Sequence, residues 1–374
     1  MKNTIGRHIS CTIFGESHGK AIGVTLDGLP AGIRIDEDWI AMRLEQRKAK
    51  GRISTQRHEP DQPIIVSGVF EGFTTGTPLT ILMENKAQHS QDYEKTKNRL
   101  RPSHADYSGD IKYFGYQDYR GGGHFSGRIT APLVAAGAIA QQILKANGIE
   151  LGTHIRCCHG IEDCAFASQE TLLEEQLHKL ETIDFPVLDE RSAQRMKEAI
   201  EAAAADGDSV GGILESAAIH VPAGLGEPFF DSMESVIAHY LYSIPAVKGV
   251  SFGQGFGFAN LFGSEANDAI LCENDRVKTR TNHNGGINGG ITNGMPLLIN
   301  TCIKPTPSIY KEQDTIHKTT HEAEKLMIQG RHDPAIIHRA RVVVDSVLAL
   351  AILDLYMERC AVVALQNHRK EETI

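Results

Sequence analysis

Long apolar runs, paired cysteines and metal-binding motifs are missing from this 374-residue sequence. No apolar stretch reaches the roughly 18 to 20 residues that span a bilayer, and the N-terminus lacks the apolar core and cleavage site of a signal peptide. The seven cysteines form no CxxC pair and no HExxH motif is present, so the sequence predicts reduced thiols and no metal site. We therefore expect a cytoplasmic protein without a membrane partner.

Basic residues are the minority among the charged ones, 38 against 47, which gives a formal net charge of −9 at pH 7. A general nucleic-acid binder carries a basic field over the domain or over one of its faces, so this balance argues against a nucleic-acid partner. Repeats, low-complexity tracts and linkers rich in Pro, Gly or Ser are also absent. Residues 1–374 are therefore expected to form a single domain.

Helical and strand-like patterns alternate irregularly along the chain. The Ala-rich segment 131–147 predicts a helix that ends at Gly148, two further helices are expected after the N-cap residues Asp36 and Asp189, and a last one over about 340–360. Runs rich in β-branched residues predict strands at 63–70, 78–83, 212–221 and 296–303. This order favours an α+β layered arrangement with antiparallel sheets over a doubly wound parallel sheet.

The most informative residues lie between these elements, in polar segments rich in glycine. Loops with many glycines and titratable side chains are costly to order, so we interpret them as ligand-binding segments. The segments are GESHG (15–19), RISTQRHEPD (52–61), RPSHADY (101–107), DYRGGGHFSGR (118–128), SIPAVKGVSFGQGFG (243–257), NHNGGINGGITNGMP (282–296), KPTPS (304–308) and GRHDP (330–334).

Basic residues gather in two stretches of this acidic protein, from Arg43 to Arg57 and from Lys95 to Arg101. Guanidinium groups match carboxylates and phosphates, so one interpretation is a pocket for a small polyanion. The other is a solvated helix end and loop. Consecutive glycines in RGGGHFSG and NGGINGG would let backbone N–H groups approach a phosphate or a planar ring. No Gly-Lys-Ser/Thr follows either segment, and GQGFGF (253–258) does not fit the dinucleotide fingerprint.

Three titratable residues stand out within these segments. His18 and His104 lie among small and polar residues, and either can act as a general acid near neutral pH. Asp333 lies between His332 and Pro334, so neighbouring cations can set its proton affinity. Each of the three can instead have a purely structural role.

Taken together, the eight segments resemble chorismate synthase, in the same order from GESHG to GRHDP and with flanks such as STQRHEPD, GVFEGFTTGTPL, HVPAGLGEP and PAVKGV. The resemblance implies conversion of 5-enolpyruvylshikimate 3-phosphate to chorismate by a 1,4-anti elimination of phosphate and a C6 proton. It implies a requirement for reduced FMN without net redox change. It also implies a β-α-β sandwich, with helices between antiparallel sheets, that assembles as a homotetramer.

Residue roles follow from the same resemblance. His18 would assist the departing phosphate, His104 would protonate or stabilise the reduced flavin near N1, and Asp333 would relay a proton at flavin N5. Positions that match substrate-binding ones are Ser17, Arg47, Arg52, Arg101, Ser126, Arg128 and Arg331. Positions that match flavin contacts are His124, Phe125, Ser126, Pro245, Ala246, Gly289, Lys304, Pro305, Thr306, Pro307, Ser308 and Arg331.

The sequence departs from the common family pattern at RGGGHFSGRIT, where many members read RGGGRSSARET. His124 and Phe125 therefore put the usual side-chain contacts in doubt, and Phe125 is expected to pack on the flavin or its neighbours. No insertion looks like a reductase segment, so an external flavin reductase is favoured over reduction of the flavin by NADPH on this chain. Three other functions stay open: a flavin-dependent oxidoreductase, a module that binds a phosphorylated acid, and a metal-dependent phosphatase.

Overall fold

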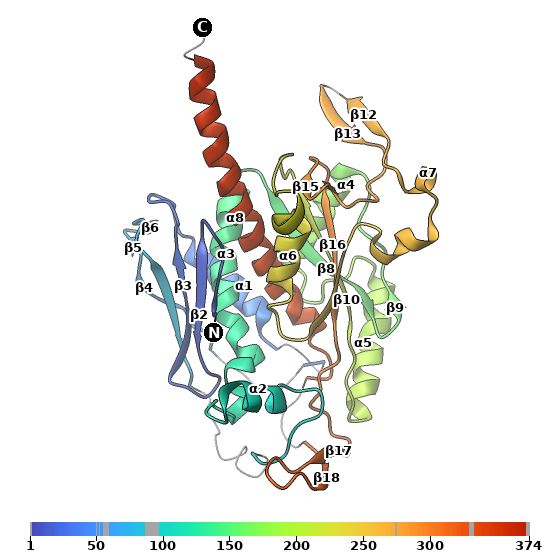
Figure 1. The fold of residues 1–374 in the computed structure, drawn as a ribbon. Helices are drawn as coiled ribbons and strands as arrows, with labels where there is room; N and C mark the ends of the chain where they lie inside the picture. Colours follow the sequence, from blue (N-terminus) through green and yellow to red (C-terminus); the bar gives the residue numbers. More distant parts are fainter. Residues whose placement is uncertain are drawn as a thin grey trace.

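Two antiparallel sheets enclose a layer of helices in the computed structural model, which describes residues 2–49, 51, 53–54, 60–86, 97–273, 275–328 and 333–371 (Figure 1). The first sheet contains, in spatial order, β1 (Thr4–Ile5), β2 (Ser10–Gly15), β3 (Ala21–Asp27), β7 (Leu79–Glu84) and β4 (Ile64–Ser67). The second contains β11 (Val247–Phe252), β16 (Leu297–Ile303), β10 (Gly212–Ile219), β8 (Glu150–Cys158) and β9 (Ile161–Glu162).

The enclosed layer is built around two long helices, α3 (Thr130–Ala146) and α8 (Ile337–Glu371) (Figure 1). α1 (Glu37–Arg47) and α6 (Met233–Leu241) pack beside them. The predicted α+β arrangement, with helices between antiparallel sheets, is therefore confirmed. The remaining helices are α2 (Asp106–Tyr113), α4 (Glu170–Thr182), α5 (Glu190–Ala205) and the short α7 (Gly263–Ala266).

Small elements fill the connections between the layers. Four hairpins pair β5 (Val69–Phe70) with β6 (Phe73–Thr74), β12 (Ile270–Glu273) with β13 (Arg276–Thr279), β14 (Ile287–Asn288) with β15 (Ile291–Thr292), and β17 (Gln313–Ile316) with β18 (Ala323–Leu326). Within the described residues, the 3₁₀ turns are η2 (Arg120–Phe125), η3 (Gly127–Ile129), η4 (Phe229–Asp231) and η5 (Gly255–Asn260).

The predicted helices begin where their capping residues place them. The Asp36 side chain accepts a hydrogen bond from Trp39 N at 3.0 Å, and Asp189 accepts one from Ser192 N at 2.8 Å. Gly148 follows α3 with a φ of 76°, as expected of a helix C-terminus. The last helix is longer at both ends than the predicted 340–360, and its first half, from Ile337 to Leu355, is almost entirely buried, polar residues such as Arg341 and Asp345 included.

The predicted strands at 78–83, 212–221 and 296–303 are β7, β10 and β16, but the single strand expected at 63–70 is wrong. The chain turns at Gly68, whose φ is 83°, so that β4 pairs with β7 and β5 pairs with β6. A Cβ at Gly68 would lie 2.4 Å from Leu79 Cα. Glycine is therefore required both for the backbone angle and for the approach to β7.

α3 and α8 cross in close contact at Gly137. A Cβ built there would lie 2.2 Å from Ser346 Cβ and 2.3 Å from Ser346 Cα, so only glycine lets the backbones approach this far. Among the described residues, one segment, Gly127–Ala146, is apolar and long enough to cross a membrane, and 78% of its window is buried in the protein. We interpret this segment as the core helix of the enclosed layer.

We predict that Gly137→Ala destabilises the protein by about 3 kcal/mol or more, because the added methyl overlaps backbone atoms that cannot move aside. Urea unfolding followed by circular dichroism measures the loss. Gly263→Ala is the control, since a Cβ at Gly263 meets nothing within 4 Å. Equal unfolding free energies for the two variants would contradict the prediction.

A fully buried imidazole ties the second sheet to the loops on its outer side. Register places His154 of β8 opposite Glu215 of β10, and His154 Nε2 lies 2.8 Å from a Glu215 carboxylate oxygen. Its Nδ1 lies 3.1 Å from Asp163, which also accepts a hydrogen bond from Leu188 N at 2.7 Å. Because carboxylates only accept, both ring nitrogens donate and the ring is cationic. Burial opposes this charge, but the hydrogen bonds that His154 donates to the two carboxylates raise its pKa overall.

This raised pKa predicts the direction of a stability change. Folding stability from His154 is fully present below its unfolded pKa, near 6.5, and is lost as pH rises through the raised folded value. We expect the unfolding free energy to fall as pH rises above about 6.5, and His154→Gln to lose this slope. His178→Gln, at a half-exposed position, should keep it. Identical pH slopes in His154→Gln and the parent protein would refute the assignment.

Candidate active site

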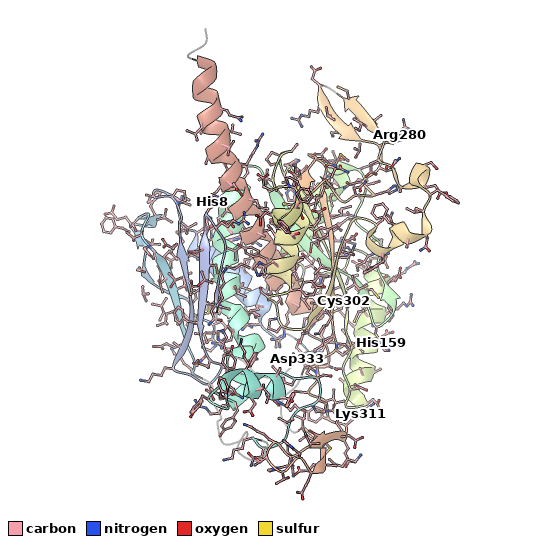
Figure 2. The ribbon with its side chains drawn as sticks, in the orientation of Figure 1. His8, His159, Arg280, Cys302, Lys311 and Asp333 are labelled. Carbon is pink, nitrogen blue, oxygen red and sulfur yellow. The ribbon has the colours of Figure 1, made fainter. Side chains whose placement is uncertain are left out.

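Several of the glycine-rich segments meet at one end of the helical layer, beside α2 (Figure 1). Ser17 N, in the β2–β3 turn, donates to the carbonyl of Gly123 in η2 at 3.1 Å. Lys304, just after β16, donates from Nζ to the carbonyl of Ser103 at 2.6 Å. Figure 2 shows Asp333 at the same end of the layer. Segments from both sheets therefore form one loop cluster, although Ser17 and Asp333 are 316 residues apart in sequence.

The three glycines of η2 bring two histidines to one turn. Gly121 and Gly122 have φ values of 59° and 84°, which favour glycine. A Cβ at Gly121 would lie 2.2 Å from His18 Cε1, and a Cβ at Gly122 would lie 3.5 Å from His104 Nε2. His18 is buried, with 4% of its surface exposed. The predicted catalytic histidines thus lie next to neighbouring glycines of the same turn.

One buried carboxylate, Asp61, pairs with two of the predicted substrate-binding arginines. Arg47, in the last turn of α1, donates to Asp61 at 2.6 Å, and Arg128 of η3 forms a second ion pair with the other carboxylate oxygen. Arg128 also donates from Nε to the Asn85 side chain at 3.1 Å. Asp61 thus fixes two guanidinium groups next to one another in a buried position, and guanidinium groups match the carboxylates and phosphate of an anionic ligand.

The second predicted histidine is held by Asp106, at the start of α2. His104 Nδ1 lies 2.7 Å from Asp106 Oδ1, and Arg101 donates from Nε and Nη2 to the two oxygens of the same carboxylate, each at 2.7 Å. Burial opposes the charge on Asp106, but the hydrogen bonds from Arg101 and His104 outweigh it, so the pKa of Asp106 lies below its ordinary value. Asp106 is therefore an anion throughout the neutral range.

Asp333 lies just before α8 and is buried, with 8% of its surface exposed. It forms an ion pair with Arg339 in the first turns of α8. Nearby, His338 Nε2 lies 2.6 Å from Ser54 Oγ, which ties the segment after α1 to α8. Burial, together with the charge of Arg339, lowers the pKa of His338 to about 4, so this ring is neutral.

The KPTPS segment closes the cluster on the side of the second sheet. Lys304 N donates to the carbonyl of Ala246 at 2.9 Å, and Ala246 has a φ of 75°, which is rare for a residue with a side chain. Two buried hydroxyls in the cluster, Ser17 Oγ and Thr306 Oγ1, have no hydrogen-bond partner among the described residues. Buried polar groups are normally satisfied, so these two point to a polar ligand.

His124 and Phe125, which depart from the family pattern, make contacts with neighbouring segments of the chain. His124 Nδ1 hydrogen-bonds the carbonyl of Gly15 at 2.7 Å, and the Phe125 ring lies against α2, 6.0 Å from the Tyr113 ring centroid. Ser126 caps η3 by accepting a hydrogen bond from Arg128 N at 3.3 Å. The structure thus packs Phe125 on protein at Tyr113, and its predicted flavin contact stays a prediction.

Not every predicted residue joins the loop cluster. Gly289 lies in the β14–β15 hairpin, where the next residue, Gly290, approaches Glu227 and Ser232 near the start of α6. The substrate-binding predictions Arg52 and Arg331 lie outside the described residues. Sequence reasoning missed Asp61 and Asp106, although both lie in segments that it singled out. The signal that could have found them is the presence of acidic residues beside the arginines, Glu59 and Asp61 in the first segment and Asp106 in the second.

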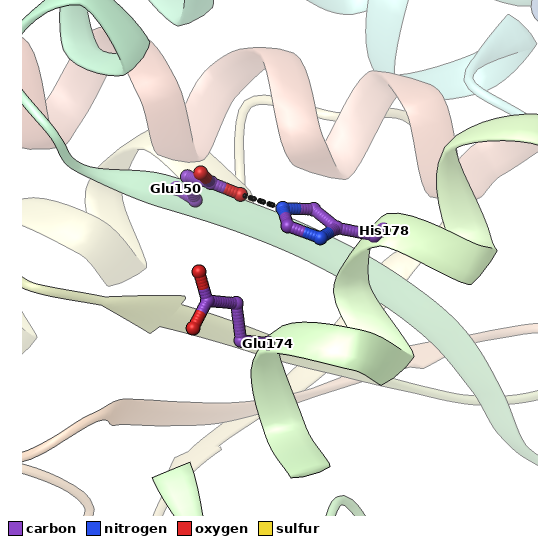
Figure 3. A group of neighbouring side chains, drawn as sticks. All are labelled: Glu150, Glu174 and His178. Atoms are coloured by element: carbon purple, nitrogen blue, oxygen red, sulfur yellow. Dashed lines mark hydrogen bonds and ion pairs between the residues drawn. The ribbon is translucent and has the colours of Figure 1, made fainter. Parts of the chain in front are cut away.

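Two other features lie away from the cluster. Glu150, Glu174 and His178, on β8 and α4, have ligand atoms within 4.8 Å of one another, and Figure 3 shows His178 hydrogen-bonded to Glu150 at 2.8 Å. An apolar hollow of about 490 Å³ lies between α3 and α8 near Ile143, Leu353 and Met357. Neither feature shares a residue with the loop cluster, so neither defines the candidate site.

A sequence model of the chorismate synthase family matches residues 9–357. The chain belongs to this family. It is 47% identical to the chorismate synthase of Pyrococcus abyssi over 93% of this chain and 96% of the relative, and 46% identical to that of Chitinophaga pinensis over 94% and 96%. A crystal structure of a chorismate synthase, 29% identical, superposes with a TM-score of 0.75 over 95% of this chain and 93% of the other.

Family membership confirms the resemblance drawn from the eight segments. Chorismate synthases are lyases that form chorismate in the shikimate pathway, and this chain is such an enzyme. The roles of individual residues remain predictions that the geometry above makes testable.

We expect Gly121→Ala to lower the rate of chorismate formation by at least tenfold, because a methyl group 2.2 Å from the His18 ring must displace it. A continuous absorbance assay for chorismate gives the rate, and thermal melting checks the fold. Gly115→Ala is the matched control: Gly115 also has a positive φ, of 77°, but a Cβ there meets only Asp110 Oδ1, at 3.5 Å. A full rate in Gly121→Ala would show that His18 is not constrained by this turn.

Proposed function

We propose that this chain eliminates phosphate and the C6 proton from 5-enolpyruvylshikimate 3-phosphate within the loop cluster, with reduced FMN as cofactor. The observation that carries the proposal is the glycine turn of η2, which has His18 next to Gly121 and His104 next to Gly122. Two acid–base groups at one turn, next to buried arginines, suit the removal of an anionic leaving group.

The substrate carries two carboxylates and a phosphate, so it needs several cations in a water-poor site. Arg47 and Arg128 supply two that are less than 10% exposed, and Arg101 supplies a third at the edge of α2. Arg52 and Arg331 are proposed as further contacts. Ser17 and Ser126 supply hydroxyls, and the Ser17 Oγ is one of the two buried hydroxyls without a partner among the described residues.

The cluster also fits a flavin. Thr306 Oγ1 is a buried hydroxyl without a hydrogen-bond partner in the described part of the chain, and Lys304 is a cation. Gly122, which has no side chain, lets a planar ring approach the backbone next to His104. We assign Pro245, Ala246 and residues 304–308 as the flavin side of the pocket. When bound, the reduced flavin supplies the electron density that weakens the allylic carbon–oxygen bond.

The three titratable residues His18, His104 and Asp333 then have different roles. His18 donates a proton to the leaving phosphate oxygen. His104 presents an N–H near flavin N1 and favours negative charge there. Asp333, held by Arg339, moves a proton at flavin N5.

The wider setting is proposed on the same basis. The hydrophobic core is continuous from Ile9 to Leu355 and contains residues of both sheets, which supports one catalytic domain. We propose a cytoplasmic homotetramer that takes reduced flavin from an external flavin reductase rather than reducing it with NADPH. The proposal includes no metal ion in the reaction.

An anaerobic assay tests the function. Purified protein is mixed with photoreduced FMN and the substrate, and phosphate and chorismate are measured together, with oxidised FMN as the control. We expect equal amounts of both products, only with reduced FMN and without net flavin oxidation. Flavin oxidised in proportion to product would indicate an oxidoreductase, and phosphate without chorismate would indicate a phosphatase, whose activity a chelator would abolish.

His18→Ala separates catalysis from binding in the same assay. We expect kcat to fall on the order of 10²-fold or more, because a general acid is lost, while the affinity for the substrate changes little. Isothermal titration with the substrate measures the affinity. A variant that retains the full kcat would exclude His18 as the acid.

A further inference from the structure

We infer that Asp106 is a positioning residue: it keeps the proton of His104 on Nδ1, leaves Nε2 as the nitrogen that exchanges a proton in the site, and holds Arg101 in the same orientation. The inference rests on the proposed role of His104 and extends it to a residue that acts through its hydrogen bonds to His104 and Arg101. It concerns which ring nitrogen of His104 exchanges a proton and which residue determines this.

The geometry of His104 gives the first step. Asp106 is ionised and can only accept, so the 2.7 Å contact requires a hydrogen on His104 Nδ1 whether the ring is neutral or cationic. The proton that the ring gains or loses is therefore the one on Nε2. This nitrogen is on the edge of the ring that faces Gly122, since a Cβ built on Gly122 would lie 3.5 Å from it.

The second step is the fork with Arg101. The guanidinium group spans both carboxylate oxygens at 2.7 Å, and Arg101 N donates to Oδ2 at 3.0 Å. Asp106 Oδ1 accepts from Arg101 and from His104 together. A carboxylate fixed by a two-point fork cannot rotate freely, so it holds the imidazole plane as well. Through this fork Asp106 links Arg101, proposed to bind the substrate, to His104, proposed to lie beside the flavin.

The position of Asp106 explains why one residue can do this. It is the first residue of α2, where an acidic side chain is favoured by the helix dipole. Its side chain is 23% exposed, so substitution there leaves the core intact. Lys304 binds the carbonyl of Ser103, one residue before His104, and so holds the same loop from the second sheet.

The test compares Asp106→Asn with Asp110→Asn, a control one turn later on α2 whose carboxylate pairs with Lys318 instead. An amide at 106 can donate to Nδ1 and so favour the opposite tautomer. We expect kcat to fall on the order of 10²-fold in Asp106→Asn, with KM raised through Arg101, and no change in Asp110→Asn. Asp106→Glu, which keeps the charge, should recover part of kcat.

A readout that does not need the flavin accompanies the rates. ¹⁵N NMR of histidine-labelled protein reports the tautomer of the neutral His104 ring, and His104→Gln identifies its signal. In the parent protein we expect the hydrogen on Nδ1, and in Asp106→Asn a shift toward Nε2. A folded Asp106→Asn variant with an unchanged tautomer, or with an unchanged kcat, would overturn the inference. If His104→Gln kept full activity, the proposed role of His104 would fail. The NMR comparison of the parent protein with Asp106→Asn would then still test whether Asp106 fixes the His104 tautomer.

Discussion

The approach of α3 to α8 at Gly137 is the contact on which the rest of the molecule depends. Each sheet buries one face against this pair of helices, and the loops of both sheets end at the same edge because the helices hold the sheets at a fixed separation. η3 leads directly into α3, and Asp333 lies just before α8. A change at the crossing would therefore move the site as well as the core, since packed interiors transmit displacement.

Shared carboxylates organise the charged side chains of the site. Asp61 holds two arginines, and Asp106 holds an arginine and a histidine. Each carboxylate fixes the orientation of the two side chains that donate to it. Buried charges without such partners would be strongly destabilising, so the acidic residues are as necessary to the site as the basic ones.

Local signals predicted much of the fold. Asp36 and Asp189 cap their helices through hydrogen bonds to backbone groups three residues away, so the sequence around them is sufficient. β8 was not predicted, because its central residues Thr153 and His154 are polar, and polar residues do not give the apolar pattern expected of a buried strand. Only the partners from β10 and the loop after β9 make that burial possible.

The sequence by itself determined the family, through eight segments in order, and the helix starts at Asp36 and Asp189, but it did not predict the glycine turn at Gly68. It also indicated His18 and His104 as acid–base groups, which the structure places next to neighbouring glycines of one turn. Only the tertiary structure decided which carboxylate forms an ion pair with which basic side chain. Asp61 is 14 residues from Arg47 and 67 from Arg128, and such pairs depend on the path of the whole chain, which no local pattern records.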